Sequence, residues 1–157
     1  MDLNLKSYLE KHNIGYKEYK HPAVFTVEQS KPFKAKIPGR HTKSLFLKDE
    51  NSQFYLVCIP ADKRLNMKLL KKELEIKELH FASPEELKVN LNLMPGSVSL
   101  FGMIYSDSVS LIIDKGLWDA ELVGFHPNIN TSTIVLNHQN LEKFYNSLKA
   151  RKEILGL

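Results

Sequence analysis

The pattern of apolar and polar positions predicts helices along much of the chain. Apolar residues recur at helical spacing in three segments: one that Asp2 caps and Gly15 follows, one over residues 66–75, and a last one that Asn137 caps. Residues 26–30 can form a further short helix. The string Ser83-Pro84-Glu85-Glu86 combines an N-cap, a first-turn proline and a capping-box glutamate. We therefore expect a further helix there, and we expect the chain to end in the helix after Asn137.

Between these helices the pattern predicts strands. Residues 42–48 and 53–59 are rich in Leu, Phe, Tyr and Val and are separated by a short polar loop, which predicts an antiparallel hairpin. Further strands are predicted over residues 16–21, 98–103, 109–114, 121–125 and 131–136. No repeat or Gly/Ser linker divides the chain, so we expect residues 1–157 to form one domain. The order of elements predicts an α/β or α+β fold, with a mixed sheet and peripheral helices.

Composition adds exclusions to this picture. The hydrophobic content of 43% is enough for one buried core. Cys58 is the only cysteine, so an intrachain disulfide and a Cys-rich zinc site are excluded. The six histidines are scattered without close ligand spacing, so we expect no metal and no cofactor. The charged residues near the N-terminus and the absence of a long apolar run favour a cytoplasmic protein without a signal peptide or membrane span.

Two segments carry candidate chemistry, although GxSxG, P-loop, HExxH and dinucleotide signatures are missing. Lys43 lies at the start of an apolar strand, where its ammonium group can bind a phosphate or a carbonyl; it can equally be a solvated strand-end lysine. Residues 125–133 hold an imidazole, amides and hydroxyls between apolar strands. These groups can position water and a ribose, or they can simply cap a turn.

A basic segment precedes Lys43. Residues 31–41 contain two prolines, a glycine and four Lys or Arg residues, which predicts an exposed basic loop that can act as a flexible lid. The chain as a whole has 22 Lys and Arg against 18 Asp and Glu, a formal charge of +4. This balance is compatible with a polyanionic partner, although a solvated surface explains it equally well.

Six segments, taken together and in order, resemble one family: HPAVFTVEQS (21–30), TKSLFLKD (42–49), DKRLNMKLL (62–70), LHFASPEEL (79–87), PGSVSLFG (95–102) and FHPNINTST (125–133). The sequence is similar to the YbaK/prolyl-tRNA-synthetase-associated editing domains, and most of all to their freestanding PrdX or ProXp-ala branch. The resemblance implies a mixed, barrel-like sheet surrounded by helices, and hydrolysis of the ester in a mischarged tRNA. Within this branch the implied substrate is Ala-tRNA(Pro).

The resemblance also implies roles for individual residues. Lys43 is expected to hold the terminal adenosine region, the Gly96 backbone to approach the aminoacyl ester, and His126 to orient the site or transfer a proton. The expected substrate-binding residues are Ser44, Ser97, Leu100, Phe101, Gly102, Asn128 and Thr131. The expected tRNA contacts are Lys31, Lys34, Lys36 and Arg40, for which an ordinary charged loop is the alternative.

Two residues depart from the branch pattern. Ser44 stands where asparagine is usual, and Leu100 stands where the glycine-rich loop has proline. A serine offers one hydroxyl in place of an amide, so water placement or amino-acid selectivity can differ.

Because of these departures, we also keep two alternatives: a tRNA-binding or regulatory module without turnover, and a deacylase for another small aminoacyl-tRNA such as Cys- or Ser-tRNA. The expected partners are tRNA and prolyl-tRNA synthetase, with no membrane, and we expect a monomer.

Overall fold

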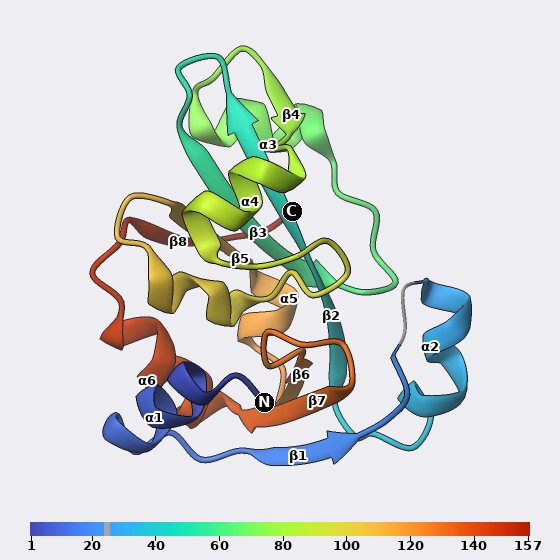
Figure 1. Ribbon diagram of the computed structural model, residues 1–157. Coiled ribbons are helices and arrows are strands. Elements are labelled where there is room, and N and C mark those ends of the chain that lie inside the picture. The colour runs from blue at the N-terminus through green and yellow to red at the C-terminus, as the bar shows by residue number, and fades with distance from the viewer. Residues whose placement is uncertain (24–25) are drawn as a thin grey trace.

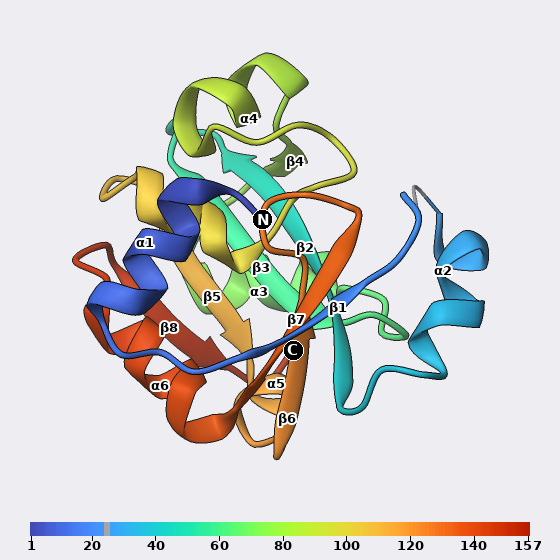
Figure 2. The ribbon, with the colours of Figure 1, turned by 60° about the horizontal axis from the view of Figure 1, so that its bottom comes forward.

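A mixed β-sheet forms the centre of the molecule, and helices surround it (Figures 1 and 2). The computed structural model describes residues 1–23 and 26–157. The strand order is β1-β7-β6-β2-β3-β5-β8, with β4 paired to β2. The pairs β2·β6, β3·β5 and β5·β8 are parallel and the other pairs are antiparallel. The predicted class, a mixed sheet with peripheral helices, is therefore confirmed.

The strands are β1 (Lys17–Lys20), β2 (Arg40–Asp49), β3 (Phe54–Pro60), β4 (Leu79–Phe81), β5 (Ser110–Asp114), β6 (Leu122–Phe125), β7 (Ser132–Asn137) and β8 (Lys152–Leu155). The helices are α1 (Leu3–Lys11), α2 (Val27–Lys34), α3 (Met67–Leu74), α4 (Pro84–Leu91), α5 (Lys115–Trp118) and α6 (His138–Ser147), with a 3₁₀ helix η1 (Leu100–Tyr105). No helix within the described ranges combines the length and the apolar character that crossing a bilayer requires.

The predicted capping residues begin the helices. Asp2 Oδ1 accepts a hydrogen bond from the Asn4 N–H at 3.0 Å, and Asn137 caps α6 in the same way. Asn66, which the sequence pattern did not mark as a cap, caps α3. At α4 the capping box is complete, because Ser83 and Glu86 each bind the other's backbone N–H. Side-chain acceptors at these positions satisfy N–H groups that no helical carbonyl can reach.

Two predicted segments have a different structure. Residues 98–103, predicted as a strand, instead lead into η1, because Ser99 Oγ accepts from the Phe101 N–H and its carbonyl accepts from Gly102. Of residues 31–41, predicted as a loop, residues 35–39 do form one, while residues 31–34 end α2 and residues 40–41 begin β2. The helix capped by Thr26 runs on to Lys34 in spite of Pro32, so it is longer than the predicted residues 26–30.

The sequence pattern missed three short elements, β4, α5 and β8. The chain does not end in a helix, since β8 follows α6 and pairs in parallel with β5. The Leu157 N–H also binds the buried Asp114 carboxylate at 3.0 Å. Segments of three or four residues carry too little periodicity to be recognised, and their neighbours in the sheet hold them in place.

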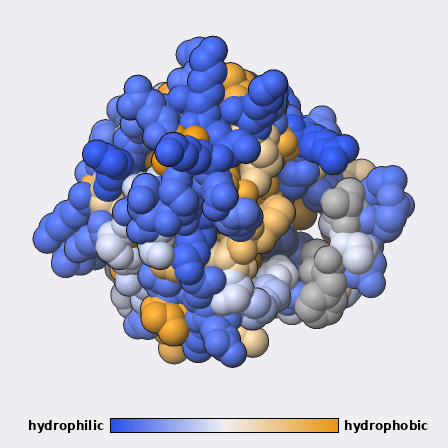
Figure 3. Space-filling view, turned by 90° about the horizontal axis from the view of Figure 1, so that it is seen from above, coloured by the Kyte–Doolittle hydropathy of each residue, from blue (hydrophilic) through white to orange (hydrophobic). Residues whose placement is uncertain are grey.

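The central strands are buried on both faces. Along β3, Leu56 and Cys58 point to the core that α1, α4, η1 and α6 cover, while Val57 and Ile59 point to a smaller core beneath α3. This placement explains why residues 54–60 read as a continuous apolar run. On the outside, hydrophilic residues dominate, with smaller hydrophobic areas between them (Figure 3).

Strand β2 changes partners along one of its edges. At its start, Arg40 and His41 pair with β6, and at its end residues 47–49 pair with β4. Strand β3 pairs with the opposite edge from Thr42 to Lys48. Between His41 and Leu47 no described strand pairs with the first edge, and the sheet opens there.

Candidate functional site

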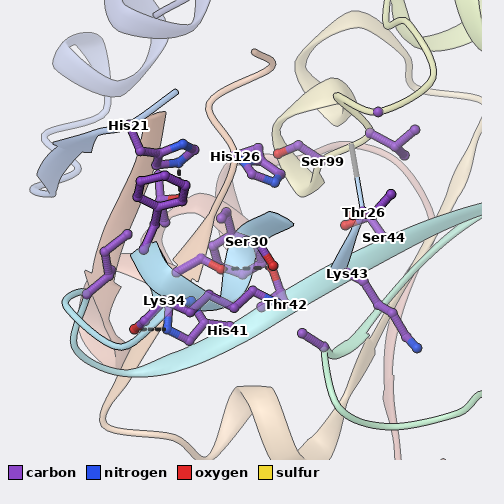
Figure 4. Close-up of a pocket in the computed structure, with 18 residues that line it drawn as sticks. His21, Thr26, Ser30, Lys34, His41, Thr42, Lys43, Ser44, Ser99 and His126 are labelled. Atoms are coloured by element: carbon purple, nitrogen blue, oxygen red, sulfur yellow. Dashed lines mark hydrogen bonds between the residues drawn. The ribbon is translucent and has the colours of Figure 1, made fainter. Parts of the chain in front are cut away.

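A cavity of about 240 Å³ lies where the edge of β2 is left open (Figure 4). Lys43, Gly96 and His126 all line it, although Lys43 and His126 are more than eighty positions apart in the chain. They come from β2, from the turn after α4 and from the loop after β6. The other lining residues are His21, Thr26, Ser30, Phe33, Lys34, Ile37, His41, Thr42, Ser44, Ala61, Val98, Ser99, Gly124, Phe125 and Thr133.

Strand β2 supplies three consecutive lining residues. The Thr42 hydroxyl donates to the Gly124 carbonyl at 2.8 Å and so ties β2 to β6. Ser44 Oγ lies 3.4 Å from the Cys58 sulfur. Burial raises the pKa of the Cys58 thiol to about 12, so this thiol stays protonated and has no access to a substrate. In Figure 4 the Lys43 side chain extends away from the histidine rings.

His126 is held in one tautomer. Its Nδ1 lies 3.2 Å from the Ser132 carbonyl oxygen, which can only accept, so Nδ1 carries the proton and Nε2 keeps a lone pair when the ring is neutral. Burial lowers the pKa of His126, and the hydrogen bond to Ser132 opposes this shift. The nearby His21, Lys34 and His41 lower the pKa further. The ring is therefore a neutral base at physiological pH.

Two more histidines complete this wall, and the sequence pattern did not predict their meeting. The His21 ring lies edge-on to His126 with centroids 6.1 Å apart, and its Nε2 is 3.0 Å from the Thr133 hydroxyl. His41 Nε2 donates to the Lys34 carbonyl at 3.1 Å, and burial lowers the pKa of His41. All three histidines lie next to a strand end, which is the only signal in the sequence that relates them.

The Gly96 turn also lines the cavity. Gly96 has φ +88°, a conformation that side chains with a Cβ disfavour, and Ser97 N–H closes the turn on the Met94 carbonyl at 3.0 Å. Among the residues that the structure describes, none accepts a hydrogen bond from the Gly96 N–H. This donor is available to a bound ester.

Several predicted substrate-binding residues lie outside the cavity lining. Leu100, Phe101 and Gly102 are buried in the core, where a Cβ on Gly102 would come within 2.6 Å of Leu93. Ser97 and Thr131 are also absent from the lining. None of these five residues therefore contacts the cavity directly.

Asn128 connects the His126 loop to the N-terminus. It has φ +64°, and its amide group donates to Asp2 Oδ2 at 3.3 Å and to the Phe101 carbonyl at 3.4 Å. Asp2 in turn accepts from the Tyr105 hydroxyl at 2.5 Å. The Asn128 Oδ1 atom is buried, with no hydrogen-bond partner in the described part of the chain. Asn128 is placed to hold the loop in shape.

The four basic residues before Lys43 lie in different surroundings. Lys34 lines the cavity, and Arg40 lies next to it at the start of β2, 3.8 Å from Asp62. Lys31 is exposed and forms an ion pair with Glu28 at 2.9 Å. Lys36 is exposed and does not line the cavity.

Comparison with known proteins gives matches along most of the chain. The chain is 33% identical over 150 residues to "Prolyl-tRNA editing protein ProX" of Acetoanaerobium sticklandii, covering 91% of this chain and 92% of that protein. It is 29% identical over 156 residues to "Prolyl-tRNA synthetase associated domain-containing protein 1" of Danio rerio, covering 97% and 85%.

Solved structures share the fold. A protein described as a candidate trans-editing enzyme for prolyl-tRNA synthetase superposes with a TM-score of 0.75 at 18% identity, covering 99% of this chain and 96% of the other. The hypothetical protein APE2540 gives a TM-score of 0.78 at 17% identity, covering 97% of each chain. The model of the aminoacyl-tRNA editing domain matches residues 21–144, which include every residue that lines the cavity. The chain therefore belongs to the aminoacyl-tRNA editing domain family.

Proposed function

We propose that the chain is a trans-editing deacylase that hydrolyses the ester of a mischarged tRNA, with Ala-tRNA(Pro) as its substrate. The observation that carries this proposal is that Lys43, Gly96 and His126 line one cavity. Family membership supplies the reaction class, and the printed names of the relatives point to tRNA(Pro).

The residues support a mechanism without a covalent intermediate. An aminoacyl ester is already activated, so positioning water and stabilising the developing oxyanion are the main tasks. The Gly96 N–H faces the ester oxygen, and the neutral His126 ring accepts a proton through Nε2 from the attacking water, directly or through the 2′-hydroxyl of the terminal ribose. The water oxygen adds to the ester carbon, the bond from that carbon to the ribose oxygen then breaks, and the proton held on His126 passes to the departing ribose oxygen. Lys43 binds the phosphate or the carbonyl as a point charge.

Selection of alanine follows from the size of the cavity. Apolar side chains of Phe33, Ile37, Val98 and Phe125 narrow a space of about 240 Å³ that must hold both the amino acid and part of the adenosine. Alanine fits where the larger proline ring meets these walls, and excluding bulk is more effective than rejecting a smaller ligand. Correctly charged Pro-tRNA(Pro) is thereby spared.

The cellular location, the oligomeric state and the partner are part of the same proposal. We place the enzyme in the cytoplasm as a monomer, acting on tRNA that prolyl-tRNA synthetase has released. Size-exclusion chromatography with light scattering, with and without that synthetase, tests the oligomeric state and the association.

A single-turnover panel of Ala-, Cys-, Ser- and Pro-tRNA(Pro) tests the activity. We expect rapid release of alanine and little release of proline. If cysteine or serine is released faster than alanine, the substrate is Cys- or Ser-tRNA(Pro) and not Ala-tRNA(Pro). Binding without release of any amino acid would show a tRNA-binding module and defeat the proposal.

Lys43→Ala tests the assignment of the site. We expect it to slow deacylation of Ala-tRNA(Pro) by about tenfold or more, because one charge-assisted contact is lost. Lys149→Ala is the matched control, since Lys149 is exposed and does not line the cavity. Unchanged deacylation by Lys43→Ala would remove Lys43 from the mechanism.

A further inference from the structure

A second, shallower hollow lies directly beside the first. It has a volume of about 350 Å³ and is lined by Lys34, Gly39, Arg40, His41, Ala61 and Asp62. Lys34, His41 and Ala61 line both hollows, so the two spaces share a wall. A ligand too long for the first cavity has this neighbouring space to extend into.

The second hollow is built on fixed backbone. Gly39 has φ +92°, and a Cβ there would lie 2.8 Å from the Leu122 side chain and carbonyl oxygen, so the turn packs tightly on the start of β6. Arg40 then pairs with Val123 across β2 and β6. The Ala61 N–H binds the His41 carbonyl at 2.9 Å, which holds the opposite rim.

The charges in this hollow favour an anion. Lys34 and Arg40 supply two cations against the single carboxylate of Asp62. The Arg40–Asp62 ion pair is long, at 3.8 Å, and the Asp62 side chain is 84% exposed, so it neutralises Arg40 only weakly. Burial lowers the pKa of Lys34; Asp62 raises it, and Lys43 lowers it again. A bound anion would stabilise both cations.

We propose that the second hollow binds the phosphodiester group that joins the terminal adenosine of the RNA to the nucleotide before it, so that Lys43 binds the ester carbonyl and not this phosphate. This inference rests on the proposed function, which places the aminoacyl ester in the first cavity. The chain of the RNA must leave that cavity through its 5′-phosphate, and the shared wall gives it an exit past Lys34. The planar guanidinium group of Arg40 matches phosphate oxygens with two parallel hydrogen bonds.

Minimal substrates test this assignment. The alanyl ester of adenosine lacks the phosphodiester, and the alanyl ester of cytidylyl-adenosine contains it. We expect the wild-type protein to hydrolyse the dinucleotide ester with a KM roughly tenfold lower. Arg40→Gln removes most of this advantage and leaves the adenosine ester unaffected. Lys149→Gln, which removes an exposed charge outside both hollows, leaves both substrates unaffected.

Two outcomes would overturn the inference. Equal losses on both esters would place Arg40 in the chemical site or in folding, and equal KM values in the wild type would show that no phosphate is bound. Calorimetric binding of adenosine and of unacylated cytidylyl-adenosine separates this inference from the proposed function. Tighter, Arg40-dependent binding of the dinucleotide without any hydrolysis would refute deacylation and retain the phosphate site.

Discussion

At the scale of single residues, the proposed role of His126 as a base predicts how the activity depends on pH. Its Nδ1 is committed to the Ser132 carbonyl, and its lowered pKa keeps Nε2 unprotonated below the pH at which an ordinary histidine gains a proton. We expect kcat to rise with pH through a value below 6.5 and to be level at neutral pH. The pH profile of single-turnover deacylation checks this, and a midpoint above 6.5 would contradict it.

The same histidine gives a mutational prediction. If His126 takes a proton in the reaction, His126→Ala lowers kcat by about 10²-fold or more. His80→Ala is the control, because His80 is exposed and lies outside the cavity. Circular dichroism melting curves of the wild type and both variants show whether a lower kcat comes from a less stable fold. An equal kcat for wild type and His126→Ala would assign His126 a structural part only.

A third prediction at this scale is that Ser44 affects which amino acid is released. Its hydroxyl lines the cavity beside the buried Cys58 thiol, at a position where the alanine-editing branch has asparagine. We expect Ser44→Asn to change the ratio of alanine to serine or cysteine release, because it adds an amide donor and acceptor to the wall. Ser44→Ala separates the effect of losing the hydroxyl. Identical substrate ratios for all three proteins would exclude Ser44 from selection.

Much of the candidate site could be predicted from the sequence because its residues lie in recognisable motifs. Lys43, Ser44, Gly96 and His126 were predicted together, and they line one cavity. His21 and His41 were not, since the pairing of β1 with β7 and of β2 with β6 brings them in from distant positions. The roles of these residues stay predictions, as does the single domain over residues 1–157.

At the scale of elements, the cap of α1 also supports the active-site loop. Asp2 holds the first turn of α1, the Tyr105 hydroxyl and the Asn128 amide. Burial alone would raise the pKa of Asp2, but these hydrogen bonds together hold it below the usual value. Because the folded pKa is lowered, this contribution to stability is present above pH 3.8 and is lost as the pH falls through the lower, folded value.

Asp2→Ala therefore has two expected effects. Loss of the cap destabilises the fold by about 1 kcal/mol, which lowers the melting temperature by roughly 2–4 °C. The loop that carries His126 also loses a restraint, so kcat falls. Asn66→Ala removes a similar cap from α3, away from the cavity, and should lower the melting temperature without changing kcat. Equal kcat losses in both variants would contradict the proposed link.

The elements also show where sequence patterns stop being informative. The helices with a cap and an apolar face, and the β2–β3 hairpin, were predicted nearly to their ends. Residues 100–103 are all buried, so their apolar pattern does not separate a strand from a 3₁₀ helix. Strand β8 depends on β5 for its pairing, and four residues contain no periodic signal of their own.

At the scale of the whole molecule, the C-terminal strand closes one edge of the sheet. Removing residues 152–157 would expose the edge of β5, whose five residues are all buried, and would remove a partner of the Asp114 carboxylate. We expect the shortened chain to melt at a lower temperature and to self-associate through the open edge. Thermal melting and size-exclusion chromatography measure these effects. A monomer with an unchanged melting temperature would show that β8 is dispensable.

The placement of the cavity at a break in strand pairing affects how such proteins can diverge. The sheet supplies one side of the cavity lining. Much of the remaining lining comes from turns, helix ends and loops outside the strands. Substitutions in those segments can therefore change which mischarged tRNA is hydrolysed, while the fold of the sheet stays the same.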